Sequence, residues 1–180
     1  MTGTPQTRLA ILRGNSGSGK STTARELRAR LGRGVAWVEQ DYVRRILLRE
    51  HDYPGAVNIG LIEQTVRYSL DHDFDVVLDG ILDAERYGAM LRRLSRDHVG
   101  VTGHYYFDIP FEETIRRHAT RPLSQKVTAA EMRGWYRTRD VLDFTAEHII
   151  GVTDTLDQTV VRILADLAWE SPQPRVDART

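Results

Sequence analysis

The chain has 180 residues, enough for one α/β domain with a buried core, and its 25 basic and 25 acidic residues balance to zero net charge. Such a chain has no overall attraction for nucleic acid or for an anionic membrane, so we expect neither as a partner. The lack of cysteine excludes a disulfide framework, a thiolate metal site and a cysteine nucleophile. The polar N-terminus and the lack of a membrane-length apolar run predict a cytoplasmic protein.

The first strand is predicted at residues 8–13, where the apolar run Leu9–Leu12 precedes a glycine-rich loop. This loop, Gly14–Ser21, fits the pattern G-x-x-x-x-G-K-[ST] at every fixed position, and a helical pattern over residues 20–32 follows it. A chance glycine-serine linker would lie between polar segments. The order strand, loop and helix instead predicts a phosphate-binding loop.

The residue types of this loop suit a nucleoside triphosphate. Glycines let backbone N–H groups turn toward an anion, and the helix N-terminus adds the positive end of its dipole. Lys20 can then reach the β- and γ-phosphates, and the small hydroxyl of Ser21 suits Mg²⁺. The residues predicted to bind the nucleotide are Gly14, Asn15, Ser16, Gly17, Ser18, Gly19, Lys20, Ser21 and Thr22.

Further strands alternate with helical patterns along the rest of the chain. Strands are predicted at residues 35–39, 74–80, 101–107 and 147–152, and helices at 41–51, 57–70, 84–96, 110–119, 129–138 and 156–169. This alternation predicts an α/β fold, a doubly wound, five-stranded, mostly parallel sheet with helices on both faces. We expect a single domain over residues 1–170, with a lid at about 117–140 and a disordered tail at 171–180.

Carboxylates follow two of the predicted strands. Asp79 ends the third strand and is predicted to hold Mg²⁺ with Ser21, because the carboxyl ends of parallel strands share one sheet edge. A helix cap is its alternative role. Asp41 follows the second strand and is the candidate base that accepts the proton of an acceptor hydroxyl. Its alternative role is also a cap, for the helix that begins there.

A local basic cluster follows the fourth strand. From Arg116 to Arg139 the chain holds six arginines and Lys126 against the single acid Glu131. Arginine stabilises the charge that spreads over a transferred phosphoryl group, which favours a lid with Arg117 and Arg121 on one helix face. A solvated basic face is the alternative.

Several motifs together resemble one group of enzymes. The loop GNSGSGKST, the stretch DYVR at Asp41–Arg44, the strand VVLDG ending at Asp79–Gly80, and the pair Arg117 and Arg121 are similar to the small P-loop kinases related to adenylate kinase. Gluconate kinase, adenylylsulfate kinase and chloramphenicol phosphotransferase are nearest in size and layout. The resemblance covers residues 8–168 and implies the three-layer sandwich of P-loop NTPases.

The resemblance also implies an activity and roles for residues. The implied enzyme is an ATP- and Mg²⁺-dependent kinase, with Lys20 and Asp41 as catalytic residues. Of the two lid arginines, also implied to be catalytic, Arg117 stacks near the nucleobase and Arg121 reaches phosphate. Besides Asp41, the implied acceptor contact is Arg44, which resembles the arginine of the D-N-V-R stretch in adenylylsulfate kinases; a solvated arginine on a helix is its alternative role. Arg86, in a run that departs from the adenylate kinase pattern, is a further candidate for contact with the acceptor.

The acceptor itself stays open between several classes. Adenylate kinases follow the third-strand Asp-Gly with F-P-R, whereas this chain continues Ile81–Arg86 as ILDAER, which disfavours a nucleoside monophosphate. The leading hypothesis is transfer to a hydroxyl of a small molecule, whether metabolite, sugar or antibiotic. A nucleoside or nucleotide kinase is the alternative. A P-loop ATPase or a GTP switch is a rival from another class, although the N-K-x-D stretch of GTP switches is absent.

Overall fold

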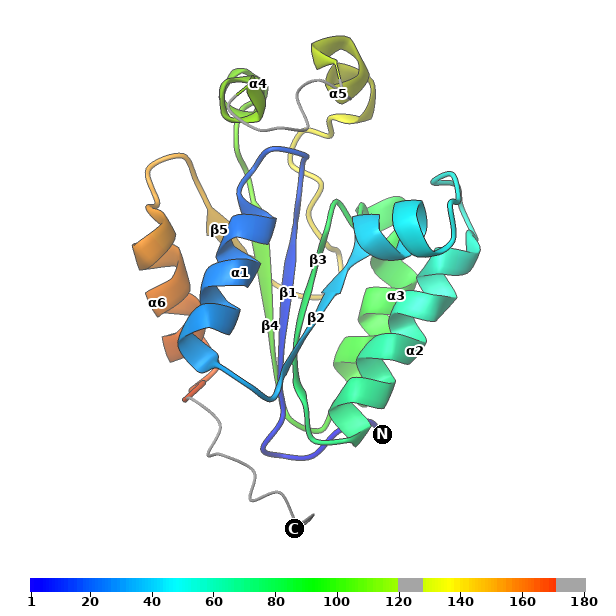
Figure 1. Ribbon diagram of the computed structural model, residues 1–180, viewed down its shortest axis with the longest axis vertical. Coiled ribbons are helices and arrows are strands. Elements are labelled where there is room, and N and C mark those ends of the chain that lie inside the picture. The colour runs from blue at the N-terminus through cyan, green and yellow to red at the C-terminus, as the bar shows by residue number, and fades with distance from the viewer. Residues whose placement is uncertain (120–127, 171–180) are drawn as a thin grey trace.

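The computed structural model describes residues 1–119 and 128–170 of the chain (Figure 1). The predicted phosphate contact of Arg121 and the predicted tail at 171–180 fall outside these residues. None of the described helices is long and apolar enough to cross a membrane. The elements are β1 Arg8–Gly14, α1 Lys20–Leu31, β2 Val35–Glu39, η1 Tyr42–Leu47, α2 Val57–Asp71, β3 Asp75–Gly80, α3 Ala84–Asp97, β4 Val101–Phe107, α4 Phe111–Ala119, α5 Ala129–Trp135, β5 His148–Ile150 and α6 Leu156–Asp166.

The five strands form one sheet in the order β2-β3-β1-β4-β5, and every neighbouring pair is parallel. Because all strands run the same way, the loop after β1, Asp79 in β3 and Asp41 after β2 share one edge of the sheet. Helices α4 and α5 lie beyond this edge, at the top of Figure 1. The predicted doubly wound α/β fold is therefore confirmed.

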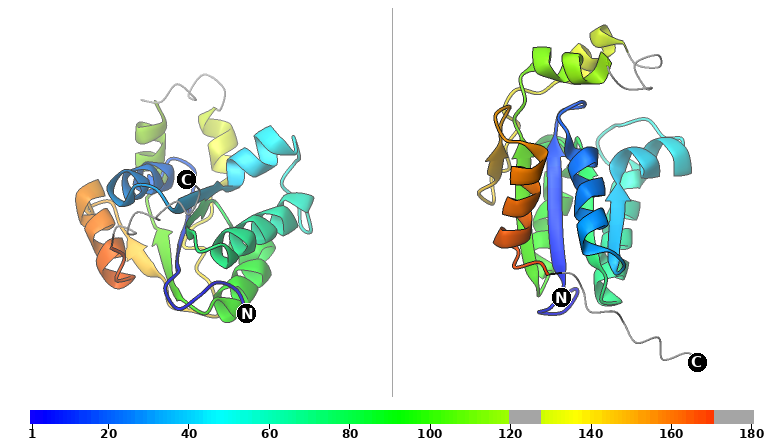
Figure 2. Two further views of the ribbon diagram at one scale, coloured as in Figure 1. Left: turned by 60° about the horizontal axis from the view of Figure 1, so that its bottom comes forward. Right: turned by 60° about the vertical axis from the view of Figure 1, so that its left-hand side comes forward.

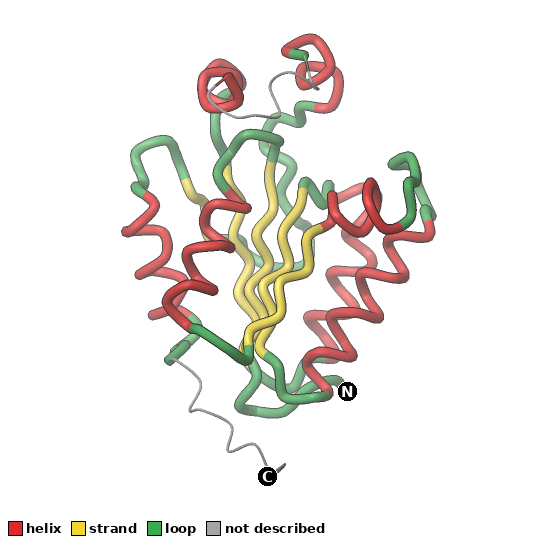
Figure 3. The backbone as a smooth tube through the Cα atoms, viewed as in Figure 1, coloured by secondary structure: helices red, strands yellow, loops and turns green. Residues whose placement is uncertain are grey.

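Helices cover both faces of the sheet (Figure 2 and Figure 3). α2 and α3 pack on one face, and α1 and α6 pack on the other. Along β1, Leu9 and Ile11 enter the first core, while Ala10 and Leu12 enter the second. Strands that are apolar on both faces are typical of parallel sheets. Arg13 continues this alternation toward α3 and, although charged, is fully buried.

The helix predicted at residues 41–51 is shorter in the structure, and its hydrogen bonds are those of a π-helix. It is the π-helix η1, in which the N–H of Leu48 bonds to the carbonyl oxygen of Val43, five residues earlier. Arg49 then adopts a left-handed φ of 52°, which ends the helix. Asp41, expected as a cap, has the helical angles φ −64° and ψ −35°.

Three elements near the C-terminus also end earlier than predicted. α5 ends at Trp135 rather than at residue 138. β5 ends at Ile150 rather than at residue 152, because the N–H of Gly151 donates to the Asp154 carboxylate at 2.7 Å. α6 ends at Asp166 rather than at residue 169, and Ala168 takes a left-handed φ of 44° just beyond it. A residue in this conformation is a common end to an α-helix.

Two buried histidines make the stability of this fold depend on pH. Burial lowers the pKa of His98 and of His104 from 6.5 to about 4, and the charge of Arg13 contributes at His104. Between these pKa values, 6.5 and about 4, the unfolded chain binds more protons than the folded chain, so these histidines lower the unfolding free energy as pH falls. We expect His104→Phe to reduce this pH slope by about 1.4 kcal/mol per pH unit, the value for one proton. Urea denaturation of the wild type and of His104→Phe between these two pKa values measures both slopes. Equal slopes in the two proteins would contradict the lowered pKa of His104.

Candidate active site

The phosphate loop turns sharply at its glycines. Gly14, Gly17 and Gly19 have φ angles of 138°, 80° and 111°, in a region that residues with a Cβ rarely adopt. A Cβ at Gly17 would also lie 2.8 Å from the carbonyl oxygen of Thr114, so the backbone of α4 rests directly on the loop. The N-terminus of α1 has no side-chain cap in the described chain, which leaves its N–H groups for an anion.

Lys20 is folded back over this loop. The residue is only 7% exposed, and Nζ donates to the carbonyl oxygen of Asn15 at 2.8 Å and to Oγ of Ser18 at 3.3 Å. Both acceptors belong to the loop itself. The ammonium group therefore lies within the predicted phosphate site, and its contact with phosphate stays a prediction.

Ser21 and Asp79 meet at the carboxyl edge of the sheet. Ser21 Oγ donates to Oδ2 of Asp79 at 2.7 Å, and the indole N–H of Trp37 donates to Oδ1 at 2.8 Å. Burial raises the pKa of Asp79, while the hydrogen bonds from Ser21 and Trp37 act against that rise. A hydroxyl and a carboxylate are oxygen donors that fit Mg²⁺, which keeps several waters and takes few protein ligands.

The alternative role of Asp79, as a helix cap, does not match the structure. Asp83 caps α3 instead, because its carboxylate accepts the N–H of Arg86 at 3.1 Å. Asp79 lies four residues earlier, with both oxygens bonded toward the phosphate loop and β2. This position supports the predicted role of Asp79 as a ligand of Mg²⁺, and the contact with the metal ion itself stays a prediction.

Trp37 and Glu39 are two site residues that our sequence analysis did not single out. Glu39 is paired in register with Asp79 across β2 and β3. Burial raises the pKa of Glu39, and the neighbouring carboxylates of Asp79 and Asp41 add to this rise. The sequence did carry a signal for these residues. Alternate residues of a strand point to the same face of the sheet, which places Trp37 and Glu39 together.

Asp41 lies at the same edge, held by two arginines of η1. Its carboxylate is 3.0 Å from Nη2 of Arg44 and 3.1 Å from Nε of Arg45. The side chain of Asp41 is 49% exposed, and it accepts no hydrogen bond from the first N–H groups of η1 among the described residues. Asp41 therefore stands at the N-cap position of η1 without a side-chain capping bond, and its role as a base stays a prediction.

Arg86, the second predicted acceptor contact, is already paired within the chain. Its guanidinium lies 2.6 Å from the Asp83 carboxylate and 3.1 Å from that of Asp52. The hydroxyl of the neighbouring Tyr87 also donates to Asp52, at 2.9 Å. Arg86 thus ties the loop before α2 to α3, and its contact with an acceptor stays a prediction.

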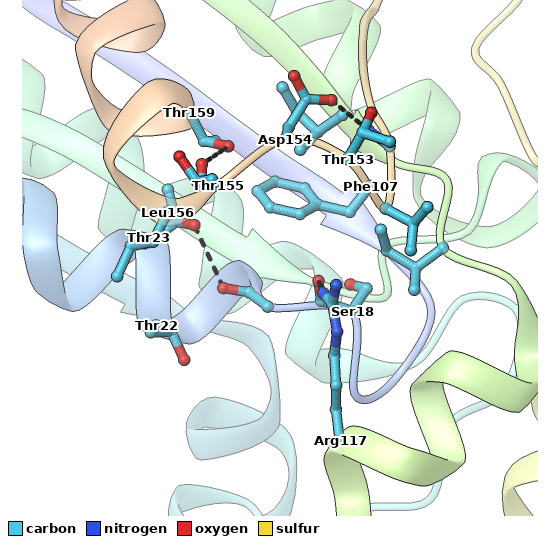
Figure 4. A pocket seen from close by; sticks show the side chains of 15 residues that line it. Ser18, Thr22, Thr23, Phe107, Arg117, Thr153, Asp154, Thr155, Leu156 and Thr159 are labelled. Atoms are coloured by element: carbon cyan, nitrogen blue, oxygen red, sulfur yellow. Dashed lines mark hydrogen bonds between the residues drawn. The ribbon is translucent and has the colours of Figure 1, made fainter.

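A pocket of about 530 Å³ opens beside the phosphate loop (Figure 4). Thr22 lines it from α1, and residues 150–156 line the opposite side, a segment that the sequence analysis did not assign to the site. Arg117 enters the pocket from α4, where Nη1 donates to the carbonyl oxygen of Ser18 at 3.0 Å and Nε donates to Glu113 at 2.6 Å. A volume of this size suits a nucleobase with its ribose.

Two residues at the base of the loop hold residues 137–147, which we call the return segment. The side-chain amide of Asn15 pairs with the backbone N–H and carbonyl oxygen of Arg137, at 2.8 and 2.7 Å. The fully buried Arg13 donates to the carboxylates of Asp140 and Glu147 at 2.7 and 2.8 Å. Neither contact had a signal in the sequence, since the partners lie more than 120 residues away.

Comparisons with known proteins agree with this fold. A family model described as an AAA domain matches residues 9–144. No curated protein matches the chain. The APS kinase CysC of Mycobacterium tuberculosis, solved with AMPPNP and APS, superposes with a TM-score of 0.72 at 20% identity, covering 91% of this chain and 99% of that one.

Two further solved structures are similar. A sugar kinase from Janibacter sp. HTCC2649 has a TM-score of 0.69 at 19% identity, over 91% of this chain and 96% of that one. A gluconokinase from Sinorhizobium meliloti 1021 has a TM-score of 0.58 at 14% identity, over 92% of this chain and 93% of that one. Likeness at these identities establishes the fold, and it confirms the resemblance to small P-loop kinases at that level. Since the family model matches residues 9–144, well over half of the chain, the chain belongs to the AAA domain family of P-loop proteins.

Proposed function

We propose that the chain is an ATP- and Mg²⁺-dependent kinase that transfers the γ-phosphoryl group of ATP to a hydroxyl group of a small molecule. The observation that carries this proposal is the strand order. The phosphate loop with Lys20 follows β1, Asp41 follows β2, and only β3 with Asp79 lies between these strands. This spacing supports transfer from a phosphate on the loop to a hydroxyl beside Asp41.

The nucleotide would lie along the loop and the adjacent pocket. Lys20 and the N–H groups of the loop would bind the phosphates, and the pocket of Figure 4 would take the base beside Arg117. Ser21 and Asp79 would hold Mg²⁺, which when bound neutralises negative charge on the β- and γ-phosphates.

Asp41 would act on the acceptor. It would accept the proton of the acceptor hydroxyl as that oxygen bonds to phosphorus and the bond to the leaving ADP breaks. Arg44 and Arg45 fix the orientation of the carboxylate through their bonds of 3.0 and 3.1 Å. The neighbours' names, APS kinase, sugar kinase and gluconokinase, support a small-molecule acceptor for a kinase of this fold.

The proposal is tested by an acceptor screen combined with Asp41→Asn. Sugars, nucleosides and hydroxylated antibiotics are screened for ADP release, and the product of each hit is identified by mass spectrometry. Asparagine can hold the hydroxyl but cannot accept its proton, so we expect Asp41→Asn to lower kcat for transfer by about 10²- to 10⁴-fold. ATP affinity, measured by calorimetry with AMPPNP, should stay within about threefold because the proposal places Asp41 at the acceptor and not at the nucleotide.

A surface aspartate provides the matched control. Asp143 is 82% exposed and also pairs with an arginine, Arg92 of α3, so Asp143→Asn removes a comparable charge from the surface. This variant should transfer phosphate at the wild-type rate. Transfer by Asp41→Asn at the same rate as Asp143→Asn would remove Asp41 from the chemistry, and ATP hydrolysis with no phosphorylated product in the whole screen would overturn the kinase proposal.

A further inference from the structure

Asn15 is the second residue of the phosphate loop, and its side chain bonds to a residue 122 positions further along the chain. Nδ2 donates to the carbonyl oxygen of Arg137 at 2.7 Å, and Oδ1 accepts the N–H of the same residue at 2.8 Å. Asn15 is 4% exposed, so water does not compete for these bonds. Two bonds to one residue fix both the position and the orientation of the chain at Arg137.

The backbone of Asn15 contacts Lys20, the residue that is predicted to bind phosphate. Its carbonyl oxygen accepts a hydrogen bond from Nζ of Lys20 at 2.8 Å. A lysine that turns toward bound phosphates exchanges this contact for contacts with the ligand. Asn15 is therefore in contact both with the group that binds the nucleotide and with the return segment.

The chain just before the return segment contacts an arginine that pairs with the candidate base. Trp135 ends α5 only two residues before Arg137, and the guanidinium of Arg45 lies 5.9 Å from the centre of its indole ring, within cation–π range. Nε of the same Arg45 is 3.1 Å from the Asp41 carboxylate. A continuous series of contacts thus runs from the loop residue Asn15 through Trp135 and Arg45 to Asp41.

A second attachment prevents the return segment from shifting along the sheet. Arg13 donates to the backbone carbonyl oxygen of Asp140 at 2.7 Å and to the carboxylate of Glu147 at 2.8 Å. The side chains of Arg13 and Glu147 are 0% and 1% exposed. With its far end fixed in this way, the near end is held at Arg137 by Asn15 and one residue earlier by Tyr136, whose hydroxyl donates to the carbonyl oxygen of Ile109 at 3.0 Å.

We infer that Asn15 is a positioning residue, which orients the Asp41 carboxylate from the phosphate loop through Trp135 and Arg45. The inference deepens the proposed function and rests on it where Asp41 acts as the base. It assigns no contact between the Asn15 side chain and the nucleotide. The position of Asp41, which acts on the acceptor hydroxyl, would then depend on the phosphate loop, which binds ATP. One loop would thereby position both reacting groups relative to each other.

The first experiment needs no nucleotide and reads the position of Trp135. The chain has three tryptophans, so the Trp135 emission is taken as the difference between each protein and its Trp135→Phe counterpart. Phenylalanine keeps a ring under Arg45, and the indole N–H that it removes is buried without a hydrogen-bond partner among the described residues. This reference variant is therefore expected to fold.

We expect Asn15→Ala to shift the Trp135 emission to longer wavelength and to increase its quenching by acrylamide, since Arg137 is released. Ser16→Ala, the same change at the adjacent loop position, should leave the Trp135 signal as in the wild type. Thermal unfolding of each variant confirms that it is folded. An unchanged Trp135 signal in folded Asn15→Ala would overturn the inference, whatever the function of the chain.

The second experiment asks whether Asn15 acts through Asp41. With an acceptor from the screen, Asn15→Ala should lower kcat for transfer by about 10- to 100-fold, the usual cost of a misplaced catalytic group. In the Asp41→Asn background the same change should have no further effect, because the group that Asn15 orients is already inactive. Trp135→Leu should behave like Asn15→Ala, and Trp135→Phe should retain most of the activity.

The outcomes separate the inference from the proposed function. An equal loss from Asn15→Ala with and without Asp41 would mean that Asn15 acts on the nucleotide, and the inference would be overturned. If the wild type transfers phosphate to no acceptor, the proposed function fails, and the Trp135 measurement alone decides whether Asn15 sets the position of Trp135.

Discussion

Lys20→Ala is expected to weaken binding of Mg²⁺ and AMPPNP by about 10- to 100-fold, the value of one charged hydrogen bond to phosphate. Phosphoryl transfer should fall further, by at least about 10²- to 10³-fold in kcat, because the ammonium group is needed most where charge develops. The fold should persist, because alanine is a good helix former at the first position of α1. Calorimetric titration and steady-state kinetics measure the two effects separately.

A second variant, Lys20→Arg, separates the effect of charge from the effect of side-chain shape. Arginine keeps the positive charge, but its wide planar fork cannot replace the compact ammonium group of Lys20, a residue that is only 7% exposed. It should recover part of the nucleotide affinity and little of kcat. Wild-type affinity in Lys20→Ala, with an unchanged melting temperature, would place the nucleotide elsewhere on the chain.

Arg13→Met is expected to lower the free energy of unfolding by about 3–5 kcal/mol, the cost of leaving a buried ion pair without one partner. The Glu147 side chain is only 1% exposed, and burial raises its pKa while Arg13 lowers it, so without Arg13 the carboxyl group must either stay charged without a cation or take up a proton, and both cost stability. Two donors to the carbonyl oxygen of Leu82 are lost as well. Urea denaturation measures the loss directly.

Two further variants identify the cause of that loss. Arg8→Met changes another arginine of β1, whose guanidinium bonds only to backbone carbonyl oxygens among its described partners, and it should cost about 1 kcal/mol. Adding Glu147→Gln to Arg13→Met should restore part of the stability, because glutamine is neutral and still accepts the N–H of Leu142. A similar loss in Arg13→Met and Arg8→Met would mean that the buried charge pair contributes little.

The phosphate loop and the parallel sheet could be predicted because their signals are local. A loop that needs left-handed angles at Gly14, Gly17 and Gly19 reveals itself in a run of nine residues, and a strand that is buried on both faces reveals itself as an apolar run. Asp79 could be placed at the site for a similar reason. It ends a predicted strand, and the carboxyl ends of all strands in a parallel sheet lie at the same edge.

The rest of the site depends on contacts between distant parts of the chain. Arg13 follows an apolar strand and gives no sign of burial, because Asp140 and Glu147, its partners, lie 127 and 134 residues further on. The pairing of Arg86 with Asp52, 34 residues earlier, likewise had no local signal, and the predicted contact of Arg86 with an acceptor stays a prediction. Helix ends were misplaced where a residue other than glycine, such as Arg49, adopts a left-handed angle that propensity does not predict.

The return segment has neither helix nor strand, but its backbone hydrogen bonds constrain its length. Arg137, Asp140 and Leu142 each donate their backbone N–H to a side-chain oxygen, from Asn15, Tyr106 and Glu147 respectively, at 2.7–2.9 Å. Loops in most proteins vary in length among relatives because their backbones bond to water. Here an inserted or deleted residue would move these N–H groups away from acceptors in the core.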